Sequence, residues 1–363
     1  MEIGAILIGS DMQRTRAGSE ALMLMVQWCF EAGYRRLEWT CDSHNEASMK
    51  AAERLGFTYE CAFRQAYATK GRNRDKAIWA IIDKDWPALS KAYEKWLDPS
   101  NFDDAAQRTS LRTLTRPSVH VAAEAALSNH ALFGRPVGPS LGDWSAPPSP
   151  PGKILDGQYA RVIPFEMAHC DALYQANSVD DAIWDYMPQG PFADFDAYRD
   201  WMEANALGPD PMFHTIIDKA DGAPAGVATY LRIAPTAGSI EVGYITYAPR
   251  LQRTRAGTEA MYLMMRHAFE LGYRRYEWKC NALNAPSRRL AMRLGLSYEG
   301  IFRQAGVVKG RNRDTAWYAA IDSEWPALKD AFEAYLAPEN FDDAGMQRQS
   351  LSYLTEPLLI ARG

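Results

Sequence analysis

The chain has 363 residues, of which 47% are apolar and 12% aromatic, and its formal net charge at pH 7 is −5. This length predicts two to three domains, and the apolar fraction is sufficient for real hydrophobic cores, which excludes wholesale disorder. The acidic balance argues against a nucleic-acid-binding protein, and no apolar run approaches the roughly 18 residues that a membrane-spanning helix needs.

Cysteine and histidine usage narrows the chemistry further. The five cysteines form no Cys-x-x-Cys pair and no regular framework, which favours reduced, structural thiols in a cytoplasmic protein. The six histidines show no metal-ligand spacing, so we expect no metal site. The apolar start from Met1 to Ile8 lacks a basic leader, and we interpret it as a strand rather than a signal peptide.

One block of about 103 residues occurs twice, and matched residues differ by 239 in number. Gln-Arg-Thr-Arg-Ala-Gly occurs at 13–18 and 252–257, and Lys-Gly-Arg-Asn-Arg-Asp occurs at 70–75 and 309–314. A period this long indicates a duplicated domain rather than a solenoid repeat. Residues 133–239 have no counterpart before the first copy, so the chain is interpreted as half a domain followed by a whole one.

Each copy is predicted to begin with a short strand, 2–8 or 240–247, then an Arg- and Gly-rich loop and a helix, 19–32 or 258–271. The second of these helices has a methionine-rich apolar face of the kind that packs into a core. The predicted elements that follow are strands near 35–41 and 274–280, helices ending near 55 and 294, hairpins at 58–69/76–83 and 297–308/315–322, and helices near 86–97 and 325–336.

The segment between the copies supplies the remaining elements. Residues 118–132 are a candidate short helix, and Pro147–Pro151 form a stiff extended stretch. Residues 165–206 are predicted to be mostly helical, with strands at 160–164, 213–218 and 226–232 on either side. The whole domain is therefore expected to run β-α-α-β-β-β-α-β-α-β-β.

The loop from Gln252 to Thr258 carries the chemistry that the residues themselves suggest. It joins a strand to a helix start, where free backbone N–H groups and the helix dipole attract anions. Arg253 and Arg255 add positive charge there, and Gly257 allows a close approach of the backbone. Taken alone the signal is weak, because many strand-to-helix turns contain Gly and Arg.

In this order of elements the chain resembles the GNAT N-acetyltransferases, in particular the branch of the ribosomal-protein N-terminal acetyltransferases. The resemblance covers about 157–322, and the first copy matches only the acetyl-CoA-binding half of the domain. The segments that carry it are Ile240–Ile245, the loop Gln252–Ala260, Asn284-x-x-Ser287 and Arg293–Gly300.

The resemblance implies an α/β fold with a mixed, mostly antiparallel sheet flanked by helices, and a division into 1–117 (partial repeat), 118–156 (linker and leader) and 157–363 (complete domain). It also implies acetyl-CoA as co-substrate, with pantetheine between strands 244–247 and 276–280. The residues expected to bind it are Ile245, Tyr247, Gln252, Arg253, Thr254, Arg255, Ala256, Gly257, Thr258, Asn284 and Ser287. Glu241 matches a common location of the general base.

Two positions depart from the family pattern. Arg255 replaces the usual first glycine of the pyrophosphate loop, which hinders one amide of the cradle. Ala291 stands where many relatives carry a tyrosine proton donor, which leaves the general acid unassigned, with Tyr298 as a weak candidate. The thiolate of CoA leaves without a dedicated acid, so neither departure excludes catalysis.

Several residues keep a structural alternative. Glu241 could pair with Arg232 instead of acting as a base, and Asn284 and Ser287 could cap a helix. Trp184, Tyr186 and Phe192 could line an acceptor pocket or simply pack in the core, and the Lys309–Asp314 turn could be only a solvated hairpin tip.

The predicted function is transfer of an acetyl group from acetyl-CoA to a primary amine, by direct attack on the thioester. The acceptor is a small-molecule amine or a protein N-terminus, with no nucleic-acid or membrane partner, and self-association into a homodimer stays open. The alternative is a non-catalytic CoA-binding or interaction protein whose extra half serves assembly. A third interpretation is that Met1 is not the natural start and that two full domains exist in tandem.

Overall fold

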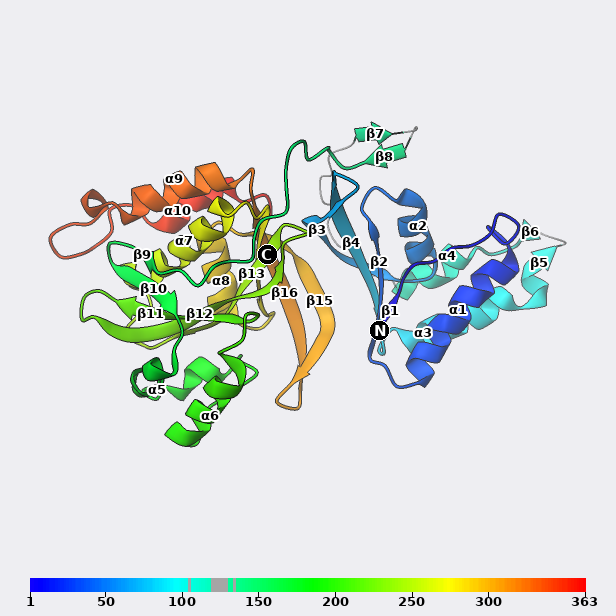
Figure 1. The fold of residues 1–363 in the computed structure, drawn as a ribbon. Helices are drawn as coiled ribbons and strands as arrows, with labels where there is room; N and C mark the ends of the chain where they lie inside the picture. Colours follow the sequence, from blue (N-terminus) through cyan, green and yellow to red (C-terminus); the bar gives the residue numbers. More distant parts are fainter. Residues whose placement is uncertain (104–105, 119–129, 133–134) are drawn as a thin grey trace. The chain divides into compact units, whose positions relative to one another are not determined.

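The structure is a computed structural model, and it describes residues 1–103, 106–118, 130–132 and 135–363. Two compact units make up the chain (Figure 1). Unit 1 consists of residues 1–64, 69–141 and 300–315, and unit 2 consists of residues 65–68, 142–299 and 316–363.

Unit 2 contains a mixed, mostly antiparallel sheet in which neighbouring strands follow the order β9-β10-β11-β12-β13-β14-β16. Only β13 and β14 are parallel to each other among the pairs with a determined register here. Its strands are β9 (Leu155–Asp156), β10 (Ala160–Pro164), β11 (Met212–Asp218), β12 (Ala223–Ala234), β13 (Ser239–Tyr247), β14 (Arg275–Asn281) and the part of β16 (Arg311–Ile321) from Ala316 on. The predicted α/β fold class is confirmed.

The helices of unit 2 cover both faces of this sheet. Figure 1 shows α5 (Cys170–Asn177) and α6 (Phe195–Asn205) side by side on one face, and α7 (Arg255–Glu270) with α9 (Trp325–Leu336) on the other. The remaining helices are α8 (Ala285–Arg293) and α10 (Leu351–Thr355), with 3₁₀ turns at Met167–His169, Asp181–Trp184, Pro338–Asn340 and Glu356–Leu358. The predicted element order of the whole domain is confirmed.

Unit 1 repeats the second half of that arrangement with strand order β1-β2-β4-β3, and the antiparallel partner of β3 is β15, through Cys61 and Gly300. The strands of its main sheet are β1 (Glu2–Ile3), β2 (Arg36–Asp42), β3 (Thr58–Thr69), β4 (Arg72–Ile82) and the part of β15 (Ser297–Val308) from Gly300 on. Two small separate sheets consist of β5 (Phe102–Asp103) with β6 (Ala106–Gln107) and of β7 (His130–Leu132) with β8 (Arg135–Val137). Its helices are α1 (Arg16–Glu31), α2 (Glu46–Arg54), α3 (Trp86–Leu97) and α4 (Leu111–Thr115), with 3₁₀ turns at Pro99–Asn101 and Arg116–Ser118.

The two copies share unusual backbone geometry as well as sequence. Left-handed φ angles recur at matched positions, 51° at Ala5 and 48° at Tyr244, and 61° at Arg14 and 63° at Arg253. A non-glycine residue with positive φ is uncommon, so its recurrence shows that each copy keeps the same local constraint. The duplicated sequence therefore encodes duplicated structure.

Some predicted boundaries need correction. The helices predicted from Ser19 and Thr258 begin three residues earlier, because Thr15 and Thr254 are the N-caps and accept hydrogen bonds from Gly18 and Gly257. The turn predicted over 309–314 is only the two-residue turn Lys309–Gly310, where positive φ at both positions matches the right-handed twist of a hairpin. Most of the helix considered at 118–132 lies outside the described residues.

Since an unpaired edge of a sheet is normally paired or covered, the sequence predicts that residues 2–8 do not face water, and this prediction is wrong. The strand β1 ends at Ile3, Gly4 to Leu7 are exposed, and the Leu7 side chain is 97% exposed. The short loop between 158–232 and the strand 240–247 predicts that this N-terminal half stays with the second copy, and the prediction is confirmed, because β12 pairs with β13 inside unit 2. Among the described residues, no strand pairs with β1 on the side that β12 occupies beside β13 in unit 2.

Candidate functional site

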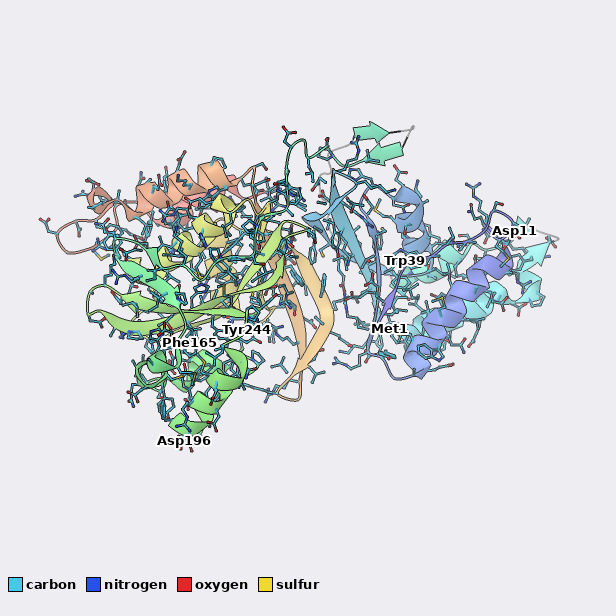
Figure 2. All side chains as sticks on the ribbon, viewed as in Figure 1. Met1, Asp11, Trp39, Phe165, Asp196 and Tyr244 are labelled. Atoms are coloured by element: carbon cyan, nitrogen blue, oxygen red, sulfur yellow. The ribbon has the colours of Figure 1, made fainter. Side chains whose placement is uncertain are left out.

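The two parallel strands of unit 2 separate at the place where the cofactor is expected. The paired register of β13 and β14 ends at Val242 and Trp278, although both strands continue. Tyr244 then adopts its left-handed φ of 48° and packs against Phe213 and Trp201, with ring centroids 5.5 and 6.3 Å away. Tyr244, labelled in Figure 2, therefore packs against the aromatic core cluster that includes Phe213. Ile245 and Tyr247 follow it on the part of β13 that is no longer paired with β14.

The loop from Gln252 to Thr258 forms the N-terminal cap of α7. The Thr254 hydroxyl accepts a hydrogen bond from the Gly257 N–H at 2.9 Å and donates to the Leu251 carbonyl at 2.7 Å. Gln252 donates from its side chain to the Tyr247 carbonyl at 3.1 Å. Within the described chain the N–H groups of Arg253, Arg255 and Ala256 have no acceptor, which is the usual state of a helix start and leaves donors for an anion.

Arg255 and Gly257 have structural roles that the sequence did not predict. The Arg255 guanidinium lies over the rings of Phe341 and Tyr159, 4.2 and 4.9 Å from their centroids. A Cβ built on Gly257 would come within 2.7 Å of the Leu251 carbonyl oxygen. Substitution of Gly257 would therefore disturb the protein itself, so Arg253, exposed at the same loop, is the cleaner probe of phosphate binding.

Glu241 is a buried carboxylate held by two cations. Its side chain is 2% exposed and accepts two hydrogen bonds from Arg232, at 2.6 and 3.0 Å, with the Lys279 ammonium 3.8 Å away. Burial raises the pKa of Glu241 above its usual value, while Arg232 and Lys279 oppose the shift. The pairing of Glu241 with Arg232, which the sequence left open as an alternative, is therefore present. Each carboxylate oxygen of Glu241 still has a lone pair that can accept a proton.

Asn284 and Ser287 both have capping contacts. Asn284 is the N-cap of α8 and accepts a hydrogen bond from the Ser287 N–H at 3.1 Å. The Ser287 hydroxyl in turn accepts a hydrogen bond from the Trp278 indole at 3.1 Å. These contacts fix the start of α8 next to the end of the paired part of β14, so the two residues are placed at the diverging strands.

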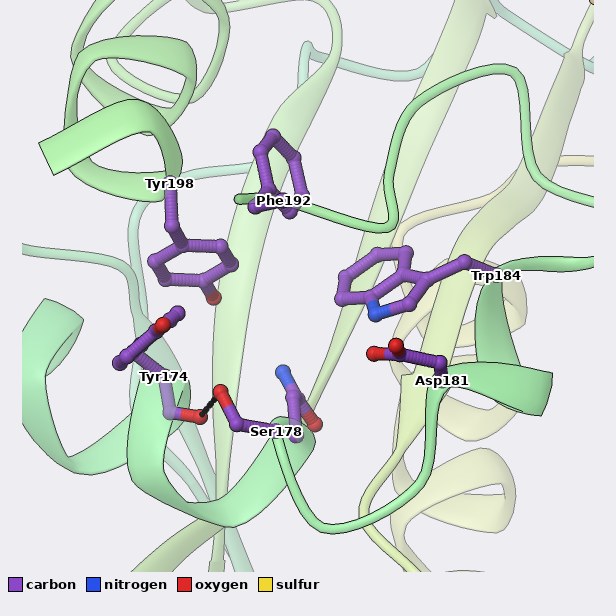
Figure 3. Close-up of a pocket in the computed structure, with 7 residues that line it drawn as sticks. Tyr174, Ser178, Asp181, Trp184, Phe192 and Tyr198 are labelled. Carbon is purple, nitrogen blue, oxygen red and sulfur yellow. Dashed lines mark hydrogen bonds between the residues drawn. The ribbon is translucent and has the colours of Figure 1, made fainter. Parts of the chain in front are cut away.

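The aromatic insert contains a cavity too small for an acceptor. Trp184 and Phe192 line it together with Tyr174, Asp181 and Tyr198, as the close-up in Figure 3 shows. Its volume is about 10 Å³, roughly the room for one water molecule. Trp184 is 5% exposed and belongs to the core, whereas Tyr186, at 37% exposed, does not line the cavity. The core interpretation therefore holds for Trp184.

The structure also shows the surroundings of Ala291, of Tyr298 as the weak candidate for the general acid, and of the five cysteines. Ala291 is fully buried, and the Tyr298 ring packs 5.5 Å from that of Tyr318. All five cysteines are buried, which supports their structural interpretation. Within the described residues no group of three or more His, Cys, Asp or Glu side chains is arranged to hold a metal ion. A search of the same residues for a helix long and apolar enough to cross a membrane found none.

The first copy lacks the partners that surround Glu241. Glu2 occupies the matched position, but it is exposed and its partner is the Thr40 hydroxyl, where the second copy has Lys279. In the part of unit 1 that the structure describes nothing corresponds to Arg232, because no strand there is equivalent to β12. A residue that sequence reasoning overlooked is Glu259 on α7, whose carboxylate accepts hydrogen bonds from the backbone N–H groups of residues 158, 159 and 160 at 2.6–2.8 Å. Its identity with Glu20 was the available signal.

Comparison with known proteins identifies the family of this chain. A family model described as an acetyltransferase (GNAT) domain matches residues 1–58 and 161–297, which together are more than half of the chain. The crystal structure of a GCN5-related N-acetyltransferase from Brucella melitensis is 46% identical, with a TM-score of 0.58, and the match covers 59% of this chain and 99% of that one.

Two further relatives show the same pattern of coverage. The crystal structure of a probable GNAT-family acetyltransferase from Chromobacterium violaceum ATCC 12472 is 35% identical, with a TM-score of 0.51, over 57% of this chain and 100% of that chain. The uncharacterized N-acetyltransferase YnaD of Bacillus subtilis (strain 168) is 26% identical over 163 residues, 44% of this chain and 92% of that protein. Each relative is matched over nearly its whole length and leaves a large part of this chain unmatched.

Proposed function

Because the chain belongs to the GNAT family of acetyltransferases, an N-acetyltransferase family that uses acetyl-CoA, we propose that residues 157–363 hold its active site and that 1–117 has none of its own. The separation of β13 and β14 directly beside the capped start of α7 carries this proposal. Pantetheine would lie along Ile245 and Tyr247, near Asn284 and Ser287, and the pyrophosphate would meet the loop from Gln252 to Thr258.

The acceptor is a primary amine, either of a small molecule or of a protein N-terminus, and the location is cytoplasmic. The five thiols are all buried, so none is placed to act as a nucleophile. The neutral amine attacks the thioester carbonyl, its proton is lost to a base, and the CoA thiolate leaves. No acyl-enzyme forms, so Cys280 has a packing role only.

We assign the base role to Glu241, directly or through one water molecule. Its raised pKa favours proton uptake, while Arg232 keeps the carboxylate oriented and ionised before the amine arrives. Because the Arg232 side chain is half exposed, it can move away from Glu241 without disturbing the core. The Lys279 ammonium is a second cation near Glu241, and it stabilises the buried carboxylate when Arg232 has moved away.

The test is acetyl-CoA turnover over a panel of amines that includes N-terminal peptides, with Glu241→Gln and the matched variant Glu2→Gln. Glu241→Gln should lower kcat by on the order of 10²-fold with little change in acetyl-CoA affinity. Glu2→Gln should leave both unchanged, because Glu2 is exposed and outside the proposed site. Near wild-type kcat for Glu241→Gln would remove this residue from the mechanism.

A further inference from the structure

The guanidinium of Arg232 has two edges that can bind a carboxylate, and Glu241 occupies one of them. The Arg232 Nε and Nη2 donate to the two carboxylate oxygens of Glu241, at 2.6 and 3.0 Å. Among the described residues the Arg232 Nη1 has no acceptor, and the side chain is 50% exposed. A guanidinium carries five N–H donors in a planar fork, so a second carboxylate fits the edge formed by Nη1 and Nη2.

The backbone around Arg232 is irregular and is held by specific hydrogen bonds. Arg232 has a left-handed φ of 46°, and such conformations in residues other than glycine cluster at functional sites. The N–H groups of Arg232 and Ile233 donate to the two carboxylate oxygens of Asp210, at 2.9 and 3.0 Å. The pairing of β12 with β13 shifts its register between Leu231 and Ala234. Irregularities of this kind reorient a side chain next to a site.

Arg232 and Glu241 lie on the face of the sheet opposite α8. Side chains alternate between the two faces along a strand. The Trp278 indole donates to Ser287 on α8, so the next residue of β14, Lys279, points to the other face. The Lys279 ammonium is 3.8 Å from Glu241, which therefore shares that face. In the proposed function the cofactor lies next to the starts of α7 and α8, so an amine approaches it from the face that carries Arg232.

Two further charged groups on this face have partners of their own. The carboxylate of Glu277 accepts from Arg275 at 2.6 Å and is 14% exposed. The Lys279 ammonium lies near Glu241 and is 18% exposed. Glu241 therefore keeps a counter-ion when Arg232 turns towards another anion. The half-exposed Arg232 is the cation of this group that a ligand reaches most easily.

We propose that the acceptor carries a free carboxylate next to its amine, as an α-amino acid does, and that Arg232 binds this carboxylate. The inference rests on the proposed function and names the class of acceptor. The carboxylate occupies the open edge of the guanidinium, and the amine, two bonds from the carboxylate carbon, lies beside Glu241. As Arg232 turns towards the carboxylate, the ammonium of the acceptor takes its place at Glu241, so neither buried nor incoming charge is left unpaired.

Steady-state kinetics of the full chain with α-amino acids and their carboxamides tests this inference. Each pair keeps the same side chain and amine and differs in the carboxylate. Loss of the carboxylate lowers the pKa of the neighbouring amine, so reactivity alone favours the amide. The wild type should instead show a kcat/KM at least about 30-fold higher for the best amino acid than for its amide. N-terminal peptides should behave like the amide, because their first carboxyl group is uncharged.

Substitution of Arg232 should remove this preference. In Arg232→Gln the ratio of the two kcat/KM values should fall to within about 3-fold of one, whereas Arg232→Lys, which keeps the charge, should retain a preference of roughly 10-fold. Arg161→Gln is the matched control, because Arg161 is 49% exposed, pairs with Asp156 at 2.7 Å and lies on β10 outside this site. Arg161→Gln should keep the wild-type ratio. The ratio is measured within each variant, so a general loss of activity cancels.

Equal use of amino acids and amides by the wild type would overturn the inference, as would an unchanged ratio in Arg232→Gln. Turnover of peptides without turnover of free amino acids would identify a protein N-terminus as the acceptor, which overturns the inference and leaves the proposed function standing. A chain that acetylates none of these amines would contradict both. Circular dichroism checks the fold of each variant, and if Arg232→Gln does not fold, the wild-type ratio and that of Arg232→Lys decide.

Discussion

The helices α1 and α7 carry nearly the same sequence in different surroundings. Both begin with a threonine N-cap, and both have a glycine in the first turn, Gly18 or Gly257, where a Cβ would clash with a backbone carbonyl oxygen. Both end just before a glycine with positive φ, Gly33 or Gly272. The helix α7 is buried on almost every side, whereas α1 is open where β9 and β10 would lie. Local sequence is therefore enough to form the helix, and the surroundings decide whether the helix belongs to a complete site.

The largest effect should come from separating the two copies. Residues 133–363 expressed alone should be soluble and active, and residues 1–125 should aggregate. The fragment 1–125 keeps the exposed Leu24, Met25 and Trp28 side chains on α1. It also loses Arg303, which pairs with Glu60 at 2.9 Å and Asp85 at 3.0 Å inside unit 1. Size-exclusion chromatography of both fragments checks this, and a well-folded, monomeric 1–125 would show that the half is self-sufficient.

Matched leucines should give a smaller but sharper contrast. Leu263→Ala should lower the free energy of unfolding by about 3 kcal/mol, because it leaves a cavity in a packed core. Leu24→Ala should cost less than about 0.5 kcal/mol, because the Leu24 side chain is 56% exposed. Denaturant unfolding followed by tryptophan fluorescence gives both values. Equal costs would mean that α1 is covered within one chain.

Acid should destabilise unit 2 through His214. Burial lowers the pKa of His214 to about 4, so the folded protein binds this proton only below that pH, while the unfolded chain binds it below about 6.5. Stability from this group is therefore complete above pH 6.5 and is lost as the pH falls towards 4, by about 2 kcal/mol at pH 5. Urea unfolding at pH 8 and pH 5 should show this loss in the wild type and not in His214→Phe. An equal loss in both would assign it to other groups.

The sequence predicted the fold well because the repeat and the family resemblance constrained every element from β10 to β16. It did not predict which side chains are exposed, because the exposure of Leu24 or Leu7 depends on the strands β9, β10 and β12, which pack against the second copy only. At the site, the pairing of Arg232 with Glu241 was anticipated as an alternative, since both residues lie on adjacent predicted strands. The stacking of Arg255 on Phe341 joins residues far apart in the chain, which no local pattern reveals. The steric role of Gly257 depends on how the loop folds back onto the Leu251 carbonyl, which the residue types alone do not specify.

The central claim is that acetyl-CoA binds at the second copy of the duplicated loop, and charge reversal at matched arginines tests it most directly. Arg253 and Arg14 are both exposed, with φ of 63° and 61°, so Arg253→Glu and Arg14→Glu strain the backbone equally. Isothermal titration of the full chain with acetyl-CoA should show affinity reduced by roughly 30-fold in Arg253→Glu and unchanged in Arg14→Glu. Unchanged affinity in Arg253→Glu, or an equal loss in Arg14→Glu, would contradict the account.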